Sequence, residues 1–198
     1  MVENATRDIP VGSVRPSAAK ARLLAVASRL FYAEGIRAVG VDRVMAEAEV
    51  ARGTFYRHFE GKDDLVRAYL EATDAGIRRQ VDAAATETGG GDALLRGIAH
   101  SIGENVCGQG FRGCPFINAA AEYPDPGSPV HQAVLAHRAW FQQVLVDAFR
   151  TAGASDPDQS AAAMVALRDG AMVAGYLGDP AVAARTMIHG STMLIAAG

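Results

Sequence analysis

Apolar residues recur with a helical period along most of the chain. Between residues 18 and 34 the apolar positions Leu23, Ala27, Leu30 and Phe31 follow one another at intervals of three and four, and Gly35 then supplies a helix stop. No stretch alternates convincingly between apolar and polar residues, as half-buried strands do. The pattern therefore predicts an all-α protein.

Shorter helices are expected after the first one. An apolar stripe at residues 41–48 predicts a second helix, residues 54–59 predict a third, and a longer fourth helix starts near Asp63 and runs into the eighties. Three glycines at residues 89–91 then end the pattern with a loop. Residues 1–16 show no periodicity and contain two prolines and a glycine, so they are expected to form a flexible N-terminal arm.

Three helix starts in the second half share one pattern. Ser128, Asp156 and Asp179 each precede a proline, which places a capping side chain before a residue whose missing N–H costs nothing in the first helical turn. With the remaining apolar stripes, these signals predict helices over residues 92–106, 115–122, 129–151, 157–177 and 180–196. We expect three parts: the arm at 1–16, a three-helix unit at 17–62 and a helical remainder at 63–198.

Composition narrows the class of protein. The 198 residues are 49% hydrophobic, which is enough to bury a core, and the formal net charge is −3. Residues 1–70 carry net charge +2 and the remainder −5, so a nucleic-acid partner would bind at the N-terminal end. Two cysteines, no signal peptide and no uninterrupted apolar run of ~18 residues favour a cytoplasmic protein that does not span a membrane.

The sequence offers little chemistry for catalysis. It has none of the Gly-x-Ser-x-Gly, His-Glu-x-x-His or Gly-x-Gly-x-x-Gly motifs, and its five histidines form no compact metal-ligand pattern with the cysteines. We therefore expect no enzyme activity, no cofactor and no metal site.

The second and third helices together predict a helix-turn-helix. Val44, Ala48, Val50 and Phe55 would be buried between them, and the outer face of the third helix would then be exposed. That face is rich in hydrogen-bond donors suited to phosphate oxygens and base edges, and Lys62 follows at the start of the next helix. The donors are Arg52, Thr54, Tyr56, Arg57 and His58.

The order of these residues resembles the signature of TetR-family transcriptional regulators over residues 17–70. The match is carried by Leu30-Phe31, Gly35, the helix pair, Thr54-Phe55-Tyr56, His58-Phe59, Gly61-Lys62 and Leu65. The resemblance implies that the third helix enters the major groove of an operator. It assigns DNA contacts to Arg52, Gly53, Thr54, Tyr56, Arg57, His58 and Lys62.

The motif departs from the family pattern at three positions. Glu49 replaces the usual turn glycine, Ala51 replaces the usual capping serine, and Gly40 stands where a capping serine or threonine is common. A non-glycine residue at positive φ is strained, and a lost cap typically costs ~1 kcal/mol, so we expect a less stable motif with its DNA-contacting donors retained.

The resemblance also implies that the C-terminal part binds a small-molecule effector and forms a homodimer, so that effector binding releases a repressor from a near-palindromic operator. Small residues dominate the last two helices, which would allow close pairing with a second copy, although a tightly packed monomer core would use them equally well. The large side chains that would contact the second copy are Met164, Leu167, Tyr176, Met187, Met193 and Leu194. Candidate pocket residues, each of which could also be an ordinary core residue, are Phe111, Phe116, Asn118, His137, Trp140, Phe141, Arg168 and Met172.

Some alternatives stay open at this point. Arg168 beside Asp169 is either an anchor for an acidic ligand or an ion pair between helices, and His137 is the polar member of an apolar helix face. Cys107 and Cys114 are either small buried residues or a redox pair, since Cys114 precedes a helix N-terminus that would favour a thiolate. The alternative function is a helical small-molecule or thiol-redox sensor with weakened operator recognition.

Overall fold

The structure is a computed structural model that describes residues 17–197, so the expected arm at 1–16 lies outside the described residues. The described residues form nine α-helices and no strand, which confirms the all-α prediction. In chain order the helices are α1 (Ala18–Glu34), α2 (Val41–Glu47), α3 (Arg52–Tyr56), α4 (Lys62–Thr88), α5 (Gly91–Val106), α6 (Pro115–Glu122), α7 (Pro129–Ala152), α8 (Pro157–Leu177) and α9 (Pro180–Ala197).

Helices α7, α8 and α9 begin where the proline pattern predicts. The Ser128 hydroxyl accepts a hydrogen bond from the Val130 amide at 3.2 Å, and the Asp156 carboxylate accepts one from the Gln159 amide at 3.0 Å. The Asp179 carboxylate accepts one from the Ala181 amide at 2.8 Å. Each cap satisfies an amide in a first turn that has no partner within its helix.

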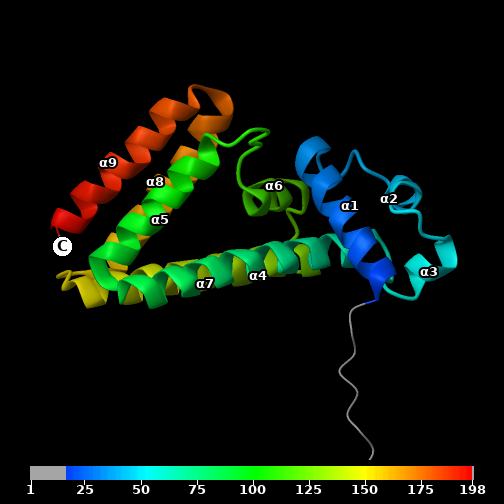
Figure 1. The fold of residues 1–198 in the computed structure, drawn as a ribbon, viewed down its shortest axis with the longest axis horizontal. Helices are drawn as coiled ribbons and strands as arrows, with labels where there is room; N and C mark the ends of the chain where they lie inside the picture. The colour runs from blue at the N-terminus through cyan, green and yellow to red at the C-terminus, as the bar shows by residue number, and fades with distance from the viewer. Residues whose placement is uncertain (1–16, 198) are drawn as a thin grey trace, which may run out of the picture.

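The helices are arranged as a head, a long connection and a block (Figure 1). Helices α1–α3 form the head at one end of the molecule, and α5, α8 and α9 pack together as a block at the other. Helices α4 and α7 contact each other and run between these ends, while the short α6 packs on α7 beside the head. The long α4 is therefore a direct mechanical link from the head to the rest of the protein.

The head does not have a core of its own. Phe31 of α1 packs edge-on against Tyr69 of α4 with ring centroids 5.9 Å apart, and the same buried cluster continues through Phe116 of α6 and Val130 of α7. A second cluster fills the block of α5, α8 and α9 and includes the residues of α7 that pack against it. Because the first cluster crosses from head to remainder, a movement of α6 cannot leave the head undisturbed.

At least two small residues of α8 and α9 allow close packing within the chain, although the small residues of these helices were expected to pair with a second copy. A Cβ atom at Gly175 would lie 2.3 Å from Val106, and one at Gly190 would lie 2.8 Å from Leu167. Met164 and Met187 are fully buried in the block, so the prediction that they supply contact bulk for a second copy is wrong.

A different set of large apolar side chains is exposed on these two helices. Tyr176 and Met193 were expected there, and Leu177 is the most exposed, at 77% of its surface. The full set on α8 and α9 is Val173, Tyr176, Leu177, Val182 and Met193.

Candidate functional site

The helix-turn-helix is built by α2 and α3. Val44, Ala48, Val50 and Phe55 are buried between the two helices and α1, as predicted. The turn between them contains Glu49 with φ of 52°, the only non-glycine residue at positive φ among residues 17–197. Ala51 occupies the N-cap position of α3 without a side-chain cap, and Gly40 does the same for α2. The expected local strain is therefore present, and the packing holds the motif together.

The outer face of α3 presents the predicted hydrogen-bond donors. Tyr56 is 51% exposed, Arg52, Gly53 and Arg57 are exposed, and Thr54 and His58 are partly exposed. Phe55 points the opposite way into the core, with its ring 5.1 Å from that of Tyr56. Lys62 is the first residue of α4 and is also partly exposed, so all seven predicted positions have side chains or backbone at or near one surface.

Three of these donors are engaged within the protein. Arg52 pairs with Asp42 of α2 at 2.7 Å, Arg57 donates to the hydroxyl of Thr54 at 2.8 Å, and the Lys62 ammonium donates a long hydrogen bond to the Arg37 carbonyl oxygen at 3.5 Å. The Arg52 and Asp42 side chains are both mostly exposed, so this ion pair is weak and can be exchanged for a phosphate or a base edge.

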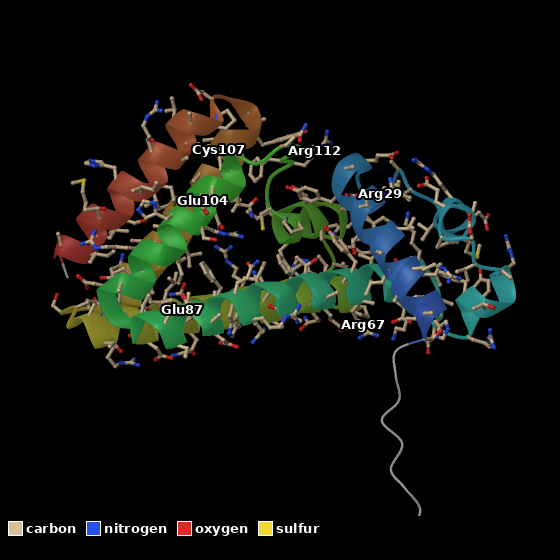
Figure 2. The ribbon with its side chains drawn as sticks, viewed as in Figure 1. Arg29, Arg67, Glu87, Glu104, Cys107 and Arg112 are labelled. Carbon is tan, nitrogen blue, oxygen red and sulfur yellow. The ribbon has the colours of Figure 1, made fainter. Side chains whose placement is uncertain are left out.

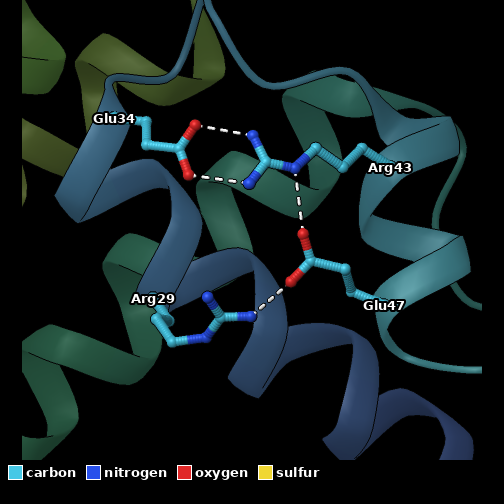
Figure 3. A network of polar contacts seen from close by, with 4 residues as sticks. All are labelled: Arg29, Glu34, Arg43 and Glu47. Carbon is cyan, nitrogen blue, oxygen red and sulfur yellow. Dashed lines mark hydrogen bonds and ion pairs between the residues drawn. The ribbon is translucent and has the colours of Figure 1, made fainter.

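A chain of ion pairs fastens α2 to α1 on another side of the head (Figure 3). Arg43 binds both carboxylate oxygens of Glu34 and also reaches Glu47, which in turn receives Arg29. Hydrogen bonds from Arg43 lower the pKa of Glu34, and those from Arg29 and Arg43 lower the pKa of Glu47. These arginines therefore belong to the scaffold of the head.

Glu122, at the end of α6, clamps the head in a way that sequence reasoning missed. Its carboxylate oxygens accept hydrogen bonds from the backbone amides of Ile36 at 2.9 Å and Arg37 at 2.6 Å, in the turn between α1 and α2. The Arg37 guanidinium also donates a hydrogen bond to the backbone carbonyl oxygen of Glu122 at 2.9 Å. No signal in the sequence links residues 85 positions apart, so this contact becomes visible only in the fold.

The α6–α7–α8 cavity is a hollow of about 210 Å³ between those three helices. It brings together four of the eight predicted pocket residues, and its walls are otherwise mainly apolar. The four predicted residues are Phe116, His137, Phe141 and Arg168.

Aromatic rings form one wall of this cavity. Phe116 of α6 stacks on His137 of α7, with centroids 3.7 Å apart and planes 5° from parallel. Trp140 lies 5.6 Å from His137 and 6.2 Å from Phe141, so it packs directly against the lining residues. A ligand that moves Phe116 would therefore disturb the environment of the single tryptophan.

The structure does not bring the predicted pocket residues Phe111, Asn118 and Met172 into this cavity. Met172 lines an adjacent hollow that Phe116 and Arg168 also border. Asn118 lines a third hollow between α1 and α6, and Phe111 packs against the first core cluster.

His137 links the cavity wall to α4. Its Nδ1 lies 2.6 Å from a carboxylate oxygen of Asp74, whose other oxygen pairs with Arg78 at 2.6 Å. Burial lowers the pKa of His137 despite the neighbouring carboxylate, so the ring is neutral near pH 7 and Nδ1 donates its proton to Asp74. Burial acts to raise the pKa of Asp74, but the bonds from His137 and Arg78 outweigh it and the pKa is lowered.

Arg168 and Asp169 form an ion pair, which was one of the two interpretations of these residues; the other was an anchor for an acidic ligand. Asp169 pairs with Arg168 at 2.8 Å and with Arg138 of α7 at 2.6 Å, so one carboxylate serves two guanidinium groups. Arg168 also lies 3.1 Å from the sulfur of Cys114, the residue that precedes α6. Arg138, Arg168 and Asp169 all line the cavity.

The two cysteines have different surroundings. Cys107 is exposed at the end of α5, where its thiol lies 3.6 Å from the carbonyl oxygen of Pro180 at the start of α9 (Figure 2). Cys114 is buried against Arg168. Nearby Arg112, in the connection from α5 to α6, lies over the ring of Tyr176.

The described residues contain neither a metal-binding cluster nor a membrane-spanning helix. Residues 17–197 contain no group of three or more His, Cys, Asp or Glu side chains placed to hold a metal ion. Within the same range, no helix is long and apolar enough to cross a membrane.

Comparisons with known proteins point to one family. Residues 23–69 match the profile of the bacterial regulatory proteins of the tetR family, and residues 108–189 match that of the tetracyclin repressor-like C-terminal domain. The chain is similar to SCO4454, a TetR-family transcriptional regulator from Streptomyces coelicolor, with 50% identity, a TM-score of 0.87 and coverage of 91% of this chain and 95% of that one.

More distant relatives agree. A regulatory protein TetR from Rhodobacter sphaeroides is 26% identical with a TM-score of 0.75, covering 91% of this chain and 99% of that one. The transcriptional regulator AcuR of Cereibacter sphaeroides is 28% identical over 86% of this chain and 82% of its own length. The two family profiles together span more than half of the 198 residues, and they join the helix-turn-helix to the helical remainder in a single polypeptide. The chain therefore belongs to the TetR family of bacterial transcriptional regulators, which are DNA-binding proteins and not enzymes.

Proposed function

We propose that the protein is a cytoplasmic repressor that binds a near-palindromic operator as a homodimer and is released when a small molecule occupies the α6–α7–α8 cavity. The observation that carries the proposal is the exposed donor face of α3, set against a buried opposite face at Phe55. That arrangement is what a recognition helix needs in order to enter the major groove.

The exposed apolar side chains on α8 and α9 support the homodimer. Five large apolar side chains are exposed on two helices that pack against each other, and two of them, Leu177 and Val182, line one hollow at the α8–α9 junction. Burying them against a second copy would remove an apolar surface from water and place two heads on one assembly. Two heads then read two half-sites about 34 Å or a multiple of it apart on one face of the duplex.

Selection from a randomised duplex pool tests the DNA-binding part. Purified protein is incubated at near-physiological salt, bound sequences are recovered, and the enriched duplex is titrated with protein of known mass. A near-palindrome bound by two copies is the expected result. If no sequence is enriched and only weak, steeply salt-dependent binding is seen, the proposal is wrong and the alternative sensor with weakened operator recognition is favoured.

A thiol-responsive regulator is a second candidate, favoured by the contact between Cys114 and the Arg168 guanidinium. The test treats the protein–operator complex with iodoacetamide. Release from the wild type and from Cys107→Ser, but not from Cys114→Ser, would support this candidate, while release unaffected by either substitution would exclude it.

A further inference from the structure

Arg168 carries more positive charge than its surroundings neutralise. The two oxygens of Asp169 are divided between Arg168 and Arg138, so this cluster bears one excess positive charge. The Arg138 side chain is 51% exposed and can be solvated, whereas that of Arg168 is only 12% exposed. The excess charge is therefore concentrated at Arg168, where water contributes little to stabilising it.

The hydrogen-bonding capacity of Arg168 is also incompletely used. A guanidinium has five N–H donors, and Arg168 directs one nitrogen to Asp169 and another to the sulfur of Cys114, a weak acceptor. Arg168 forms no further hydrogen bond within residues 17–197, and its guanidinium lies 5.8 Å from the centre of the Phe141 ring. Arg168 borders both the α6–α7–α8 cavity and the neighbouring hollow.

The other titratable groups that border the cavity are already committed. His137 places its Nδ1 on Asp74, and His131 places its Nδ1 on the carbonyl oxygen of Tyr123 at 2.7 Å. Asp169 is shared by the two arginines. Arg168 is thus the buried cation that a ligand would meet.

The rest of the cavity sets the size and polarity of the ligand. Phe116, Val134, Phe141 and Val165 give it apolar walls. Its volume of about 210 Å³ is below the ~300–1,000 Å³ of pockets for drug-sized ligands. A phosphate dianion would bring more charge than the cluster can balance, whereas a carboxylate brings one charge and two oxygens that match the guanidinium fork.

We propose that the α6–α7–α8 cavity binds a small organic monocarboxylate, with its charge on Arg168 and its apolar body against Phe116 and Phe141. The proposal rests on the function proposed above and names the chemical class of the effector. Binding replaces the weak acceptor Cys114 with an ionic one and brings the ligand against α6, which carries both Phe116 and Glu122.

Ligand binding without DNA tests the proposal. The probes are straight-chain carboxylates from acetate to hexanoate, benzoate, and the neutral amide of each acid. Because Trp140 is the only tryptophan and packs against His137 and Phe141, its fluorescence reports occupancy, and calorimetry checks the affinity. We expect at least one acid to bind about tenfold or more tightly than its amide. Equal binding of every acid and its amide, or no binding by any acid, overturns the proposal.

Charge variants locate the site. Arg168→Met should weaken binding of the best acid by about tenfold or more, and Asp169→Asn should strengthen it because a competing carboxylate is lost. Arg150→Met, the same charge change near the far end of α7, serves as the matched control and should leave affinity unchanged. If Arg168→Met fails to fold in a thermal melt, Asp169→Asn still decides the matter, since unchanged or weaker binding contradicts the proposal.

The two proposals fail in distinguishable ways. An enriched palindrome together with no acid binding overturns the ligand class and leaves the regulator proposal intact. If an acid binds in a manner that depends on Arg168 but the protein selects no operator, the ligand class is supported and the regulator proposal is overturned.

Discussion

The side-chain carboxylate of Glu122 accepts a hydrogen bond from the backbone amide of Ile36, and so ties the end of α6 to the turn that follows α1. The same carboxylate holds the next amide, at Arg37. Helix α6 also supplies Phe116 to the cavity wall, so a single eight-residue helix contacts both the ligand site and the head. The turn accommodates the contact because Gly35 takes φ of 94°, a conformation that strains other residues.

Glu122→Ala should uncouple the two sites. We expect the loss of charged acceptors to cost about 1 kcal/mol, a fall in Tm of ~2–4 °C, and to reduce effector-driven release of the operator. Glu122→Gln retains an oxygen for one amide and should fall between the alanine variant and the wild type. Thermal melts and operator titrations with and without effector check this, and an alanine variant with wild-type Tm and wild-type release would refute the coupling role.

Substitutions on the head should separate general from specific DNA contacts. Tyr56→Phe or Lys62→Ala should weaken binding about equally on all duplexes, because each removes a phosphate contact, and Lys62→Ala should also make binding less salt-sensitive because it removes a positive charge. Arg52→Ala should instead relax preference at one operator position if Arg52 reads a base. The comparison uses binding isotherms at several salt concentrations, with Arg150→Ala as a control remote from the head. Wild-type affinity in all three head variants would remove α3 as the recognition helix.

Acidification should destabilise the protein through His137. Its pKa is lowered in the folded state, so as pH falls below the ordinary value of ~6.5 the unfolded chain takes up a proton that the folded protein resists. Stability is therefore lost between that pH and the lowered pKa. The lowered pKa of Asp74 adds a further loss at still lower pH. The expected result is a smaller urea midpoint at pH 5.5 than at pH 7.5.

The variant His137→Asn isolates this contribution. Asparagine keeps a donor for Asp74 but does not titrate, so its midpoint should fall less between the two pH values. The other four histidines are common to both proteins and cancel in the comparison. An equal fall in variant and wild type would show that His137 does not control the pH dependence.

Glu49→Gly should stabilise the head. A left-handed conformation costs a non-glycine residue ~1–2 kcal/mol, while glycine loses ~0.5–1 kcal/mol of extra backbone entropy on folding, which leaves a gain of up to about 1.5 kcal/mol. Glu49→Ala keeps the Cβ atom and should show no such gain. Urea unfolding distinguishes the two, and a glycine variant less stable than wild type would mean that the turn is not strained at this residue.

Charge at Leu177 should break the proposed dimer. Leu177→Asp places a carboxylate at the most exposed of the large apolar residues on α8 and α9, where burial against a second copy would be costly. We expect the dimerisation constant to weaken by about tenfold or more, measured by sedimentation. Leu135→Asp, at another exposed apolar residue on α7, should leave the mass unchanged. If Leu177→Asp remains a dimer at the same concentrations, the two copies must meet through another surface.

Local signals explain why the helices could be predicted. Asp156 and Pro157 act within one turn, so their effect is readable from neighbouring residues, and α8 begins and ends at the predicted positions. The donor face of α3 was predictable for the same reason, since Phe55 and Tyr56 are adjacent and must point in different directions.

Contacts between distant segments could not be predicted. Asp74 meets His137 across 63 positions, and Cys114 meets Arg168 across 54, and nothing near either residue announces its partner. The prediction of which residues contact a second copy was wrong at two positions for a related reason. Methionine packs equally well in a core or at an interface. The sequence therefore could not show that Met164 and Met187 are buried within the chain while Leu177 is exposed.

The length of α4 has a geometric consequence. Asp74, which holds His137, lies twelve residues after Lys62 at the start of the helix, a separation of about 18 Å at 1.5 Å per residue. A tilt of ~10° about Asp74 would therefore displace Lys62 by about 3 Å, close to the ~3.4 Å rise between stacked base pairs. A rotation small enough to be absorbed by side-chain adjustments around the cavity would thus move the start of α4, which follows α3 in the head, by about the rise of one base pair.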